Sequence, residues 1–189
     1  MLYGALPARR RDAQRNRAAI VRAASEVMTS AGSVIPMPEI ARRAGVGQAT
    51  LYRHFPDRPA LAAAVIDHHL QRLETFAGSE ACLPSLFRDL LREVLHTQVT
   101  MRPLVLLARR FDPGARDKYQ KRLLAAFREP LRRAQSHGYV RRDVAPADLL
   151  LLFAMVHGVT ESAEEVAGAR AAADRCIDLL LDGVFNRAT

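Results

Sequence analysis

The sequence predicts an all-α fold, because two patterns agree. Apolar residues recur at the spacing of one helical face along most of the chain, whereas the alternating β-branched runs typical of strands do not occur. Proline and glycine then divide the chain into segments of helical length. With 189 residues, of which 49% are hydrophobic, the chain can bury a sizeable core in one or two small domains.

The first predicted helix covers residues 11–31. Its apolar residues fall on one face at helical spacing: Ile20, Ala24, Val27, Met28 and Ala31. Gly32 follows and ends the pattern.

Residues 36–44 predict a second, short helix. Ile40, Ala41 and Ala44 share one of its faces. Gly45 follows at the position where a helix C-cap needs a positive φ. Because Ala41 and Gly45 are small, they let two helices cross closely, as a helix-turn-helix requires.

Residues 48–55 predict the second helix of this pair. Leu51 and Phe55 lie one turn apart and are expected to face inward. The outward positions hold Gln48, Ala49, Tyr52 and Arg53. Such side chains suit a helix that lies in a DNA groove. A generic helical core with a chance glycine turn would not explain why this face holds these residues instead of Glu and Lys.

The remaining segments predict further helices. The fourth opens at Pro56-Asp57, with Asp57 as its N-cap, and runs to about Phe76, where Gly78 and Ser79 mark a link. The others are expected near 83–100, 103–110, 115–136, 147–164 and 168–187, with a loop over 137–146. We expect Pro130 to kink the helix that contains it.

The positive charge is concentrated in the first third of the chain. The formal net charge is +8, and residues 1–60 hold ten arginines against four acidic residues. This excess can neutralise phosphates and release counterions. No apolar run is long enough to span a bilayer, and the first residues do not form a secretion signal. We therefore expect a cytoplasmic protein with no membrane partner, in which Cys82 and Cys176 are reduced.

Three consecutive motifs resemble the TetR family of bacterial transcription regulators. They are IARRAGV at 40–46, TLYRHF at 50–55 and PDRPAL at 56–61, within a resemblance that covers roughly residues 11–70. The resemblance implies a three-helix DNA-binding domain with a helix-turn-helix, over residues 1–56. It also implies a helical-bundle C-terminal domain for ligand binding and dimerisation, over residues 57–189.

The resemblance implies a role for each residue of the DNA-binding motif. Gln48 and Ala49 would meet base edges of operator double-stranded DNA, since Gln can pair with adenine and an Ala methyl can touch thymine. Residues expected to hold the phosphate backbone are Thr50, Tyr52, His54 and Arg58. Residues expected to add positive charge are Arg42, Arg43 and Arg53. The arm Arg9 to Arg11 is expected to reach the DNA backbone or a minor groove. One departure is that Pro36 and Pro38 stand where the family often has a Ser or Thr that caps the helix and touches phosphate.

The last two predicted helices are apolar on more than one face. Such helices must be covered on more than one side. In the resembled family the last two helices pair with their symmetry mates. We therefore expect a homodimer that forms through residues 147–187, with a fully intramolecular core as the alternative.

The resemblance further implies an unknown small-molecule effector in the second domain. A pocket needs a few polar groups in an apolar lining. Polar candidates on otherwise apolar faces are Gln98, Tyr119 and His157. Apolar candidates are Phe87, Leu91, Met101 and Phe127. The expected function is that of a ligand-responsive repressor of a neighbouring gene.

Two other functions stay open. One is a DNA-binding regulator that works without a ligand and has a solid second domain. The other is an enzyme or a small-molecule binding protein on the same scaffold. The serines have no nucleophile context, the histidines lack zinc spacing, and Gly45-Val46-Gly47 lacks the strand and lysine of a phosphate loop. We therefore expect no enzyme activity, no cofactor and no metal.

Overall fold

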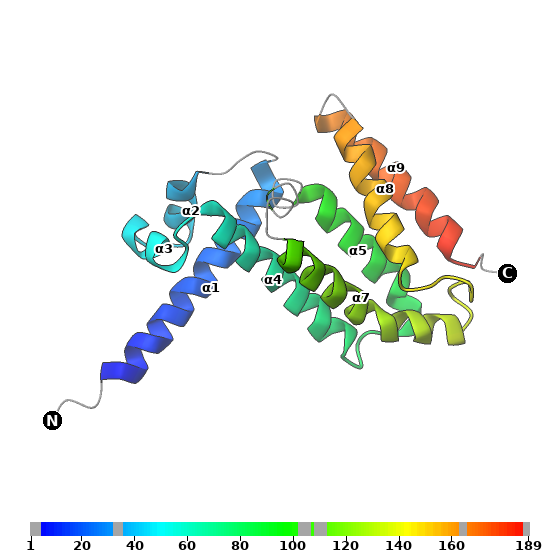
Figure 1. The fold of residues 1–189 in the computed structure, drawn as a ribbon, viewed down its shortest axis with the longest axis horizontal. Helices are drawn as coiled ribbons and strands as arrows, with labels where there is room; N and C mark the ends of the chain where they lie inside the picture. Colours follow the sequence, from blue (N-terminus) through cyan, green and yellow to red (C-terminus); the bar gives the residue numbers. More distant parts are fainter. Residues whose placement is uncertain (1–4, 32–35, 102–106, 108–112, 163–165, 187–189) are drawn as a thin grey trace. The chain divides into compact units, whose positions relative to one another are not determined.

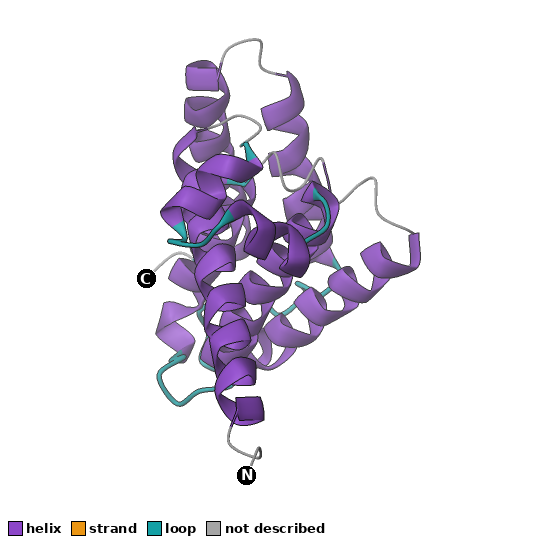
Figure 2. Ribbon diagram, turned by 90° about the vertical axis from the view of Figure 1, so that its left-hand side faces the viewer, coloured by secondary structure: helices purple, strands orange, loops and turns teal. Residues whose placement is uncertain are grey.

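The computed structural model describes residues 5–31, 36–101, 107, 113–162 and 166–186. These residues form helices joined by loops and turns, and Figure 2 shows no strand among them. The prediction of an all-α fold is therefore confirmed. The helix expected over 103–110 lies almost wholly outside the described residues.

The chain divides into two compact units, and the division falls inside one helix. The first unit holds residues 1–68 and 103–111, and the second holds residues 69–102 and 112–189. Helix α4, Arg58–Ala77, is continuous and contributes its first part to one unit and its second part to the other. The domain boundary expected after residue 56 stays a prediction.

The first unit contains the helices α1 (Ala5–Ala31), α2 (Met37–Arg43) and α3 (Gln48–His54), labelled in Figure 1. Helix α1 contacts both α2 and α3. Its predicted apolar face is buried as far as the side chains are described, because Ile20, Ala24 and Val27 are at most 3% exposed. Helix α1 begins before the predicted residue 11, so Arg9 to Arg11 lie within a helix.

The second unit is built around α5 (Phe87–Thr100), which contacts α7 (Pro113–Ser136), α8 (Asp148–Ser162) and α9 (Val166–Val184). A 3₁₀ turn, η1 (Pro84–Leu86), precedes α5, and α8 packs along α9. Helix α7 continues through Pro130, which lies inside it. The loop predicted over 137–146 is confirmed, since those residues lie between α7 and α8.

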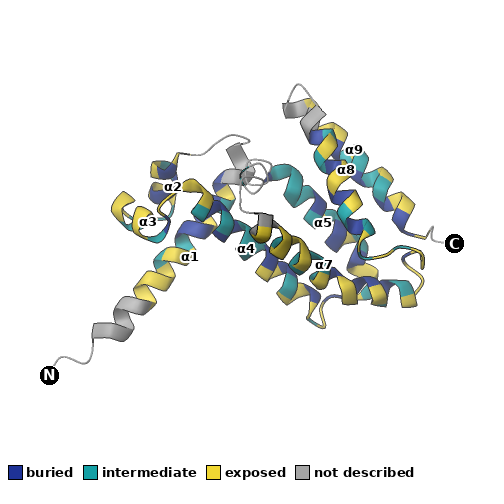
Figure 3. Ribbon diagram, viewed as in Figure 1, coloured by how far each residue is buried: buried dark blue, intermediate teal, exposed yellow. Residues whose placement is uncertain are grey.

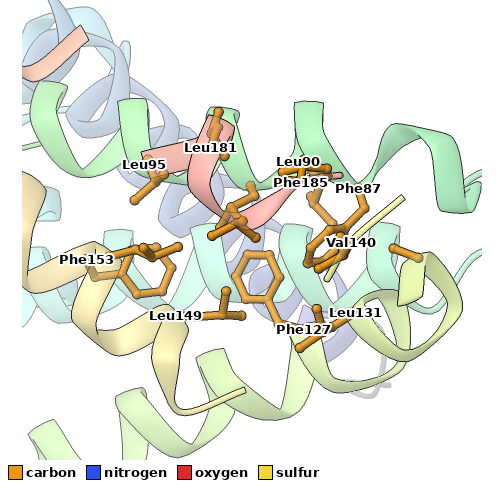
Figure 4. Close-up of a cluster of buried hydrophobic side chains, with 14 of the residues drawn as sticks. Phe87, Leu90, Leu95, Phe127, Leu131, Val140, Leu149, Phe153, Leu181 and Phe185 are labelled. Carbon is orange, nitrogen blue, oxygen red and sulfur yellow. The ribbon is translucent and has the colours of Figure 1, made fainter. Parts of the chain in front are cut away.

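Aromatic rings fill the core of the second unit (Figure 4). Phe127 meets Phe87 edge to face, with ring centroids 6.1 Å apart, and its centroid lies 6.2 Å from that of Phe153. Since these rings come from α7, α5 and α8, one cluster joins three helices. Burial of such large rings and the edge-to-face geometry of Phe87 and Phe127 both stabilise the unit.

Candidate nucleic-acid interface

A glycine turn fixes the angle between α2 and α3. Gly45 has φ +67°, the left-handed conformation that its sequence position predicts. Its N–H donates to the carbonyl of Arg42 at 3.2 Å, and the N–H of Val46 donates to the carbonyl of Ala41 at 3.0 Å. These two bonds form a Schellman motif, which satisfies the last carbonyls of α2 and redirects the chain into α3.

Helix α3 is attached to the first unit by its apolar face. Leu51 is fully buried and Phe55 is 2% exposed, so the prediction that both face inward is confirmed. The guanidinium of Arg17 on α1 lies 5.3 Å from the centroid of the Phe55 ring. This cation–π contact and the burial of Leu51 hold α3 against the unit.

The outer face of α3 is free to meet a partner. Gln48, Ala49, Tyr52 and Arg53 are exposed, whereas Thr50 and His54 are half-buried. Tyr52 is 45% exposed, so its ring and hydroxyl are accessible on this face. Figure 3 shows exposed positions along α2 and α3.

The start of α4 adds another exposed cation to the unit. The Oδ1 of Asp57 accepts a hydrogen bond from the N–H of Ala60 at 2.8 Å, so Asp57 is the predicted N-cap. This cap makes Arg58 the first residue of α4, and Arg58 is exposed. At the start of α2, Pro36 is the N-cap without a side-chain hydrogen bond, and the helix forms with Pro38 in its first turn.

An acidic residue that the sequence reasoning did not single out connects the two arginines of α2. Arg42 donates from Nε and Nη2 to the two carboxylate oxygens of Glu39, each at 2.7 Å, and Arg43 donates from Nε at 2.8 Å. Hydrogen bonds from Arg42 and then Arg43 lower the pKa of Glu39 from its ordinary 4.5 to about 2. The i, i+3 and i, i+4 spacing could have predicted these pairs.

Both parts of the chain match known families. Residues 20–65 match the bacterial regulatory proteins of the tetR family, and residues 79–185 match the C-terminal domain of SbtR-like transcriptional regulators. The chain belongs to the TetR family of transcriptional regulators. It is therefore a DNA-binding transcriptional regulator, and α3 is the second helix of its helix-turn-helix.

Solved structures of TetR regulators cover nearly the whole chain. A TetR transcription regulatory protein from Mycobacterium vanbaalenii is 31% identical, with a TM-score of 0.67 over 94% of this chain and 99% of its own. The TetR regulator SCO0520 from Streptomyces coelicolor is 28% identical, with a TM-score of 0.62 over 91% of this chain and 99% of its own. A comparison with curated proteins finds no match. No helix in the described part of this TetR protein is long and apolar enough to cross a membrane.

The residues predicted to bind an effector lie in different surroundings. Phe87, Leu91 and Phe127 are fully buried in the core cluster. Met101, at the C-cap of α5, is also buried. The half-buried residues are Gln98, Tyr119 and His157. Within the described residues, the buried Oε1 of Gln98 has no hydrogen-bond partner. The effector-binding role of all seven stays a prediction.

A cavity of about 250 Å³ lies elsewhere in the second unit, between the second part of α4, α5 and α7. Its polar lining residues are His69, Arg72, Glu93 and Thr97. Its apolar lining residues are Leu70, Leu73, Phe76, Leu90, Val94 and Leu123. The described lining includes none of the seven residues predicted from the sequence. The regular i, i+3, i+4 and i+7 spacing of the lining on α4 and on α5 is the only sequence signal for it.

An apolar face of α8 and α9 is exposed to solvent. Leu151, Met155 and Leu179 are 56%, 51% and 54% exposed. Leu180, the neighbour of Leu179, instead packs against the core cluster of its own chain. Three large exposed apolar side chains on two adjacent helices form a patch of the kind that marks a protein interface.

Proposed function

We propose that this TetR regulator is a ligand-responsive repressor that binds operator DNA as a homodimer. The observation that carries the proposal is the outer face of α3, where Gln48, Ala49, Tyr52 and Arg53 are exposed on a helix that its apolar side anchors. A recognition helix presents its N-terminal residues to base edges in the major groove. Gln48 and Ala49 are the first two residues of α3.

The proposed contacts are of two kinds, those to base edges and those to backbone phosphates. Gln48 and Ala49 read bases, since an amide can pair with adenine and a methyl group can touch thymine. The residues proposed to hold phosphates are Thr50, Tyr52, Arg53, His54 and Arg58, with Arg42 and Arg43 on α2. Phosphate contacts fix the orientation of the protein on the duplex and carry no sequence information directly.

The proposed dimer forms through residues 147–187, that is, through α8 and α9. The exposed Leu151, Met155 and Leu179 support it, because a second copy would remove this apolar patch from water. Two copies related by a two-fold axis would present two recognition helices to a near-palindromic site. Their spacing would have to match one helical turn of DNA, roughly 34–36 Å, or a multiple of it.

The proposed effector site is the cavity beside α4. Helix α4 lines this cavity through His69, Arg72, Leu73 and Phe76, and the same helix begins at Arg58. A ligand in the cavity would release DNA only if it bound the DNA-incompetent state more tightly.

A regulator that works without a ligand is the second candidate, and two observations favour it. The cavity volume of about 250 Å³ lies slightly below the ~300–1,000 Å³ common for ligand pockets. Phe87, Leu91 and Phe127 fill the core of the second unit.

The test of repression uses the DNA upstream of the gene and of its neighbours. Gel shift and footprinting locate a protected site, and in vitro transcription from that promoter measures the sign of regulation. We expect a protected near-palindrome and less transcript as protein is added. A protected site with more transcript would make the protein an activator.

A further inference from the structure

The exposed face of α2 carries one carboxylate between two arginines. Glu39 accepts three hydrogen bonds, two from Arg42 and one from Arg43, at 2.7–2.8 Å. The side chains of Arg42 and Arg43 are nevertheless 71% and 42% exposed. On the opposite face, Met37 and Ile40 are buried and attach the helix to its unit.

Each guanidinium keeps donors that Glu39 does not use. A guanidinium has five N–H groups in a planar fork. Arg42 gives Nε and one Nη2 hydrogen to Glu39, and Arg43 gives only Nε. The Nη1 group of Arg42 and both Nη groups of Arg43 therefore remain able to donate to another acceptor.

We propose that Glu39 is a positioning residue for DNA binding, which holds the guanidinium groups of Arg42 and Arg43 side by side so that their remaining donors contact adjacent backbone phosphates. The inference rests on the DNA-binding function and on α2 crossing the DNA backbone, as the first helix of a helix-turn-helix does. Pro36 and Pro38 have no side-chain donor, and within α2 the side-chain donors are those of Arg42 and Arg43.

Two physical effects of Glu39 on DNA affinity oppose each other. Its negative charge repels the phosphates, and salt screens this repulsion at an exposed site. Its hydrogen bonds already restrict the rotamers of two long side chains in the free protein. Less side-chain entropy is therefore lost when these side chains contact DNA, which favours binding. If removal of the Glu39 charge weakens DNA binding, the positioning effect is larger. If removal strengthens binding, the charge repulsion is larger.

The chain contains a matched control for this arrangement. Glu129 on α7 precedes Arg132 and Arg133 with the same spacing, and Arg132 donates to its two oxygens at 2.8 and 2.6 Å. The Nε of Arg133 lies 4.0 Å from the same carboxylate. Glu129 therefore pairs with Arg132 as Glu39 pairs with Arg42, with a longer contact to the second arginine, but it belongs to the second unit.

The experiment measures binding to a fluorescein-labelled mixed-sequence 30-base-pair duplex by anisotropy, over a series of KCl concentrations. The variants are Glu39→Gln, Glu129→Gln, the pair Arg42→Ala with Arg43→Ala, and this pair combined with Glu39→Gln. Circular dichroism melting checks that each variant is folded. Because the three bonds to Glu39 are on the surface, we expect Glu39→Gln to fold normally.

We expect Glu39→Gln to weaken duplex binding about three- to tenfold, and Glu129→Gln to leave it unchanged. The double arginine variant should lower the slope of log K against log[KCl] by about two per subunit, one for each lost phosphate contact. In that background, Glu39→Gln should no longer weaken binding.

Three results would overturn the proposal. Glu39→Gln could bind the duplex as tightly as the wild type or more tightly, which would show that Glu39 affects DNA affinity only through charge repulsion. The loss could persist without the two arginines, which would make Glu39 a structural residue. The double arginine variant could keep the wild-type salt slope, which would show that neither Arg42 nor Arg43 contacts a phosphate. Failure of the wild type to bind any duplex would instead refute DNA binding, and the role of Glu39 with it.

Discussion

The Nη1 of Arg92 on α5 donates to the Oδ1 of Asp178 on α9 at 2.6 Å, which links two helices whose residues are 86 positions apart. The same pattern repeats one turn away on each side. Arg88 donates to Asp182 at 2.6 Å, and the Nδ1 of His96 lies 3.3 Å from the Oδ1 of Asp174. The residue numbers of the three pairs rise along α5 and fall along α9, so the two helices are antiparallel. Together the pairs define one register of α5 against α9.

Asp178→Asn should make the protein less stable at neutral pH. The hydrogen bond from Arg92, followed by the charges of Arg92, Arg175 and Arg88, lowers the pKa of Asp178 below its ordinary 3.8. The resulting stabilisation is complete above about pH 4 and is lost as the pH falls through the lower, folded-state pKa. Urea unfolding at pH 7 and at pH 3 measures the free energy of unfolding of both proteins.

The loss at pH 7 should be small, because the pair is on the surface, and the difference in stability between the two proteins should be smaller at pH 3 than at pH 7. Asp117→Asn serves as the control for a charge lost from an ion pair within one helix, since Asp117 pairs with Lys121 on α7. An equal difference at both pH values would contradict a role for the ionised carboxylate of Asp178.

Gly45→Ala should destabilise the first unit by about 1–2 kcal/mol, the cost of a left-handed conformation for a residue with a Cβ. Gly45 has φ +67°, and an added Cβ would meet no atom within 4 Å, so the backbone alone sets this cost. Gly45→Asn should lose less, because asparagine tolerates this region. Thermal unfolding followed by circular dichroism gives both values. Equal losses for the two variants would point to a steric cause.

Gln48→Ala should relax base preference at one or two operator positions and weaken binding to the preferred site by about 1–3 kcal/mol. Tyr52→Phe removes a hydroxyl that we assign to a phosphate, so it should weaken all sequences alike. Selection of bound sequences from a randomised duplex pool measures both effects. If the Gln48→Ala protein selects the same bases as the wild type, another side chain reads them.

Leu179→Glu should give a folded monomer, whereas Leu180→Glu should unfold the second unit. Leu179 is 54% exposed on the proposed dimer face, and Leu180 packs on the intramolecular core. A charge in a desolvated seam costs several kcal/mol. Sedimentation equilibrium reports the mass, and circular dichroism reports the fold. A dimeric Leu179→Glu protein would move the interface away from this face.

A thermal-shift screen of the wild type first identifies a compound that raises its melting temperature. Val94→Trp should fill the cavity beside α4 and abolish the rise in melting temperature that this compound causes. Leu86→Trp, at an exposed position outside the cavity lining, should bind the compound as the wild type does. A compound that still stabilises Val94→Trp would bind elsewhere.

The same compound should weaken operator binding, with a coupling of about 1–3 kcal/mol. Operator DNA should weaken binding of the compound by the same factor, because coupling is reciprocal. Titrations of the compound with and without operator measure this directly. Equal affinity in both would favour the regulator that works without a ligand.

Local rules made much of the first unit readable from the sequence. The positive φ of Gly45, the N-cap at Asp57 and the inward positions of Leu51 and Phe55 each depend on residues within one or two turns. The pairs that Glu39 makes with Arg42 and Arg43 obey the same kind of rule. They could therefore have been predicted from the spacing of these residues in the sequence.

Only the tertiary structure decided which faces of the second unit are buried. Helix α9 has leucines at three consecutive positions, 179–181, so its periodicity does not indicate which of them faces α8 and α5. Packing exposes Leu179 and buries Leu181. The cavity likewise depends on which sides of α4, α5 and α7 meet. Its lining residues are far apart in sequence, and contacts of that kind are set by long-range packing, which local spacing does not encode.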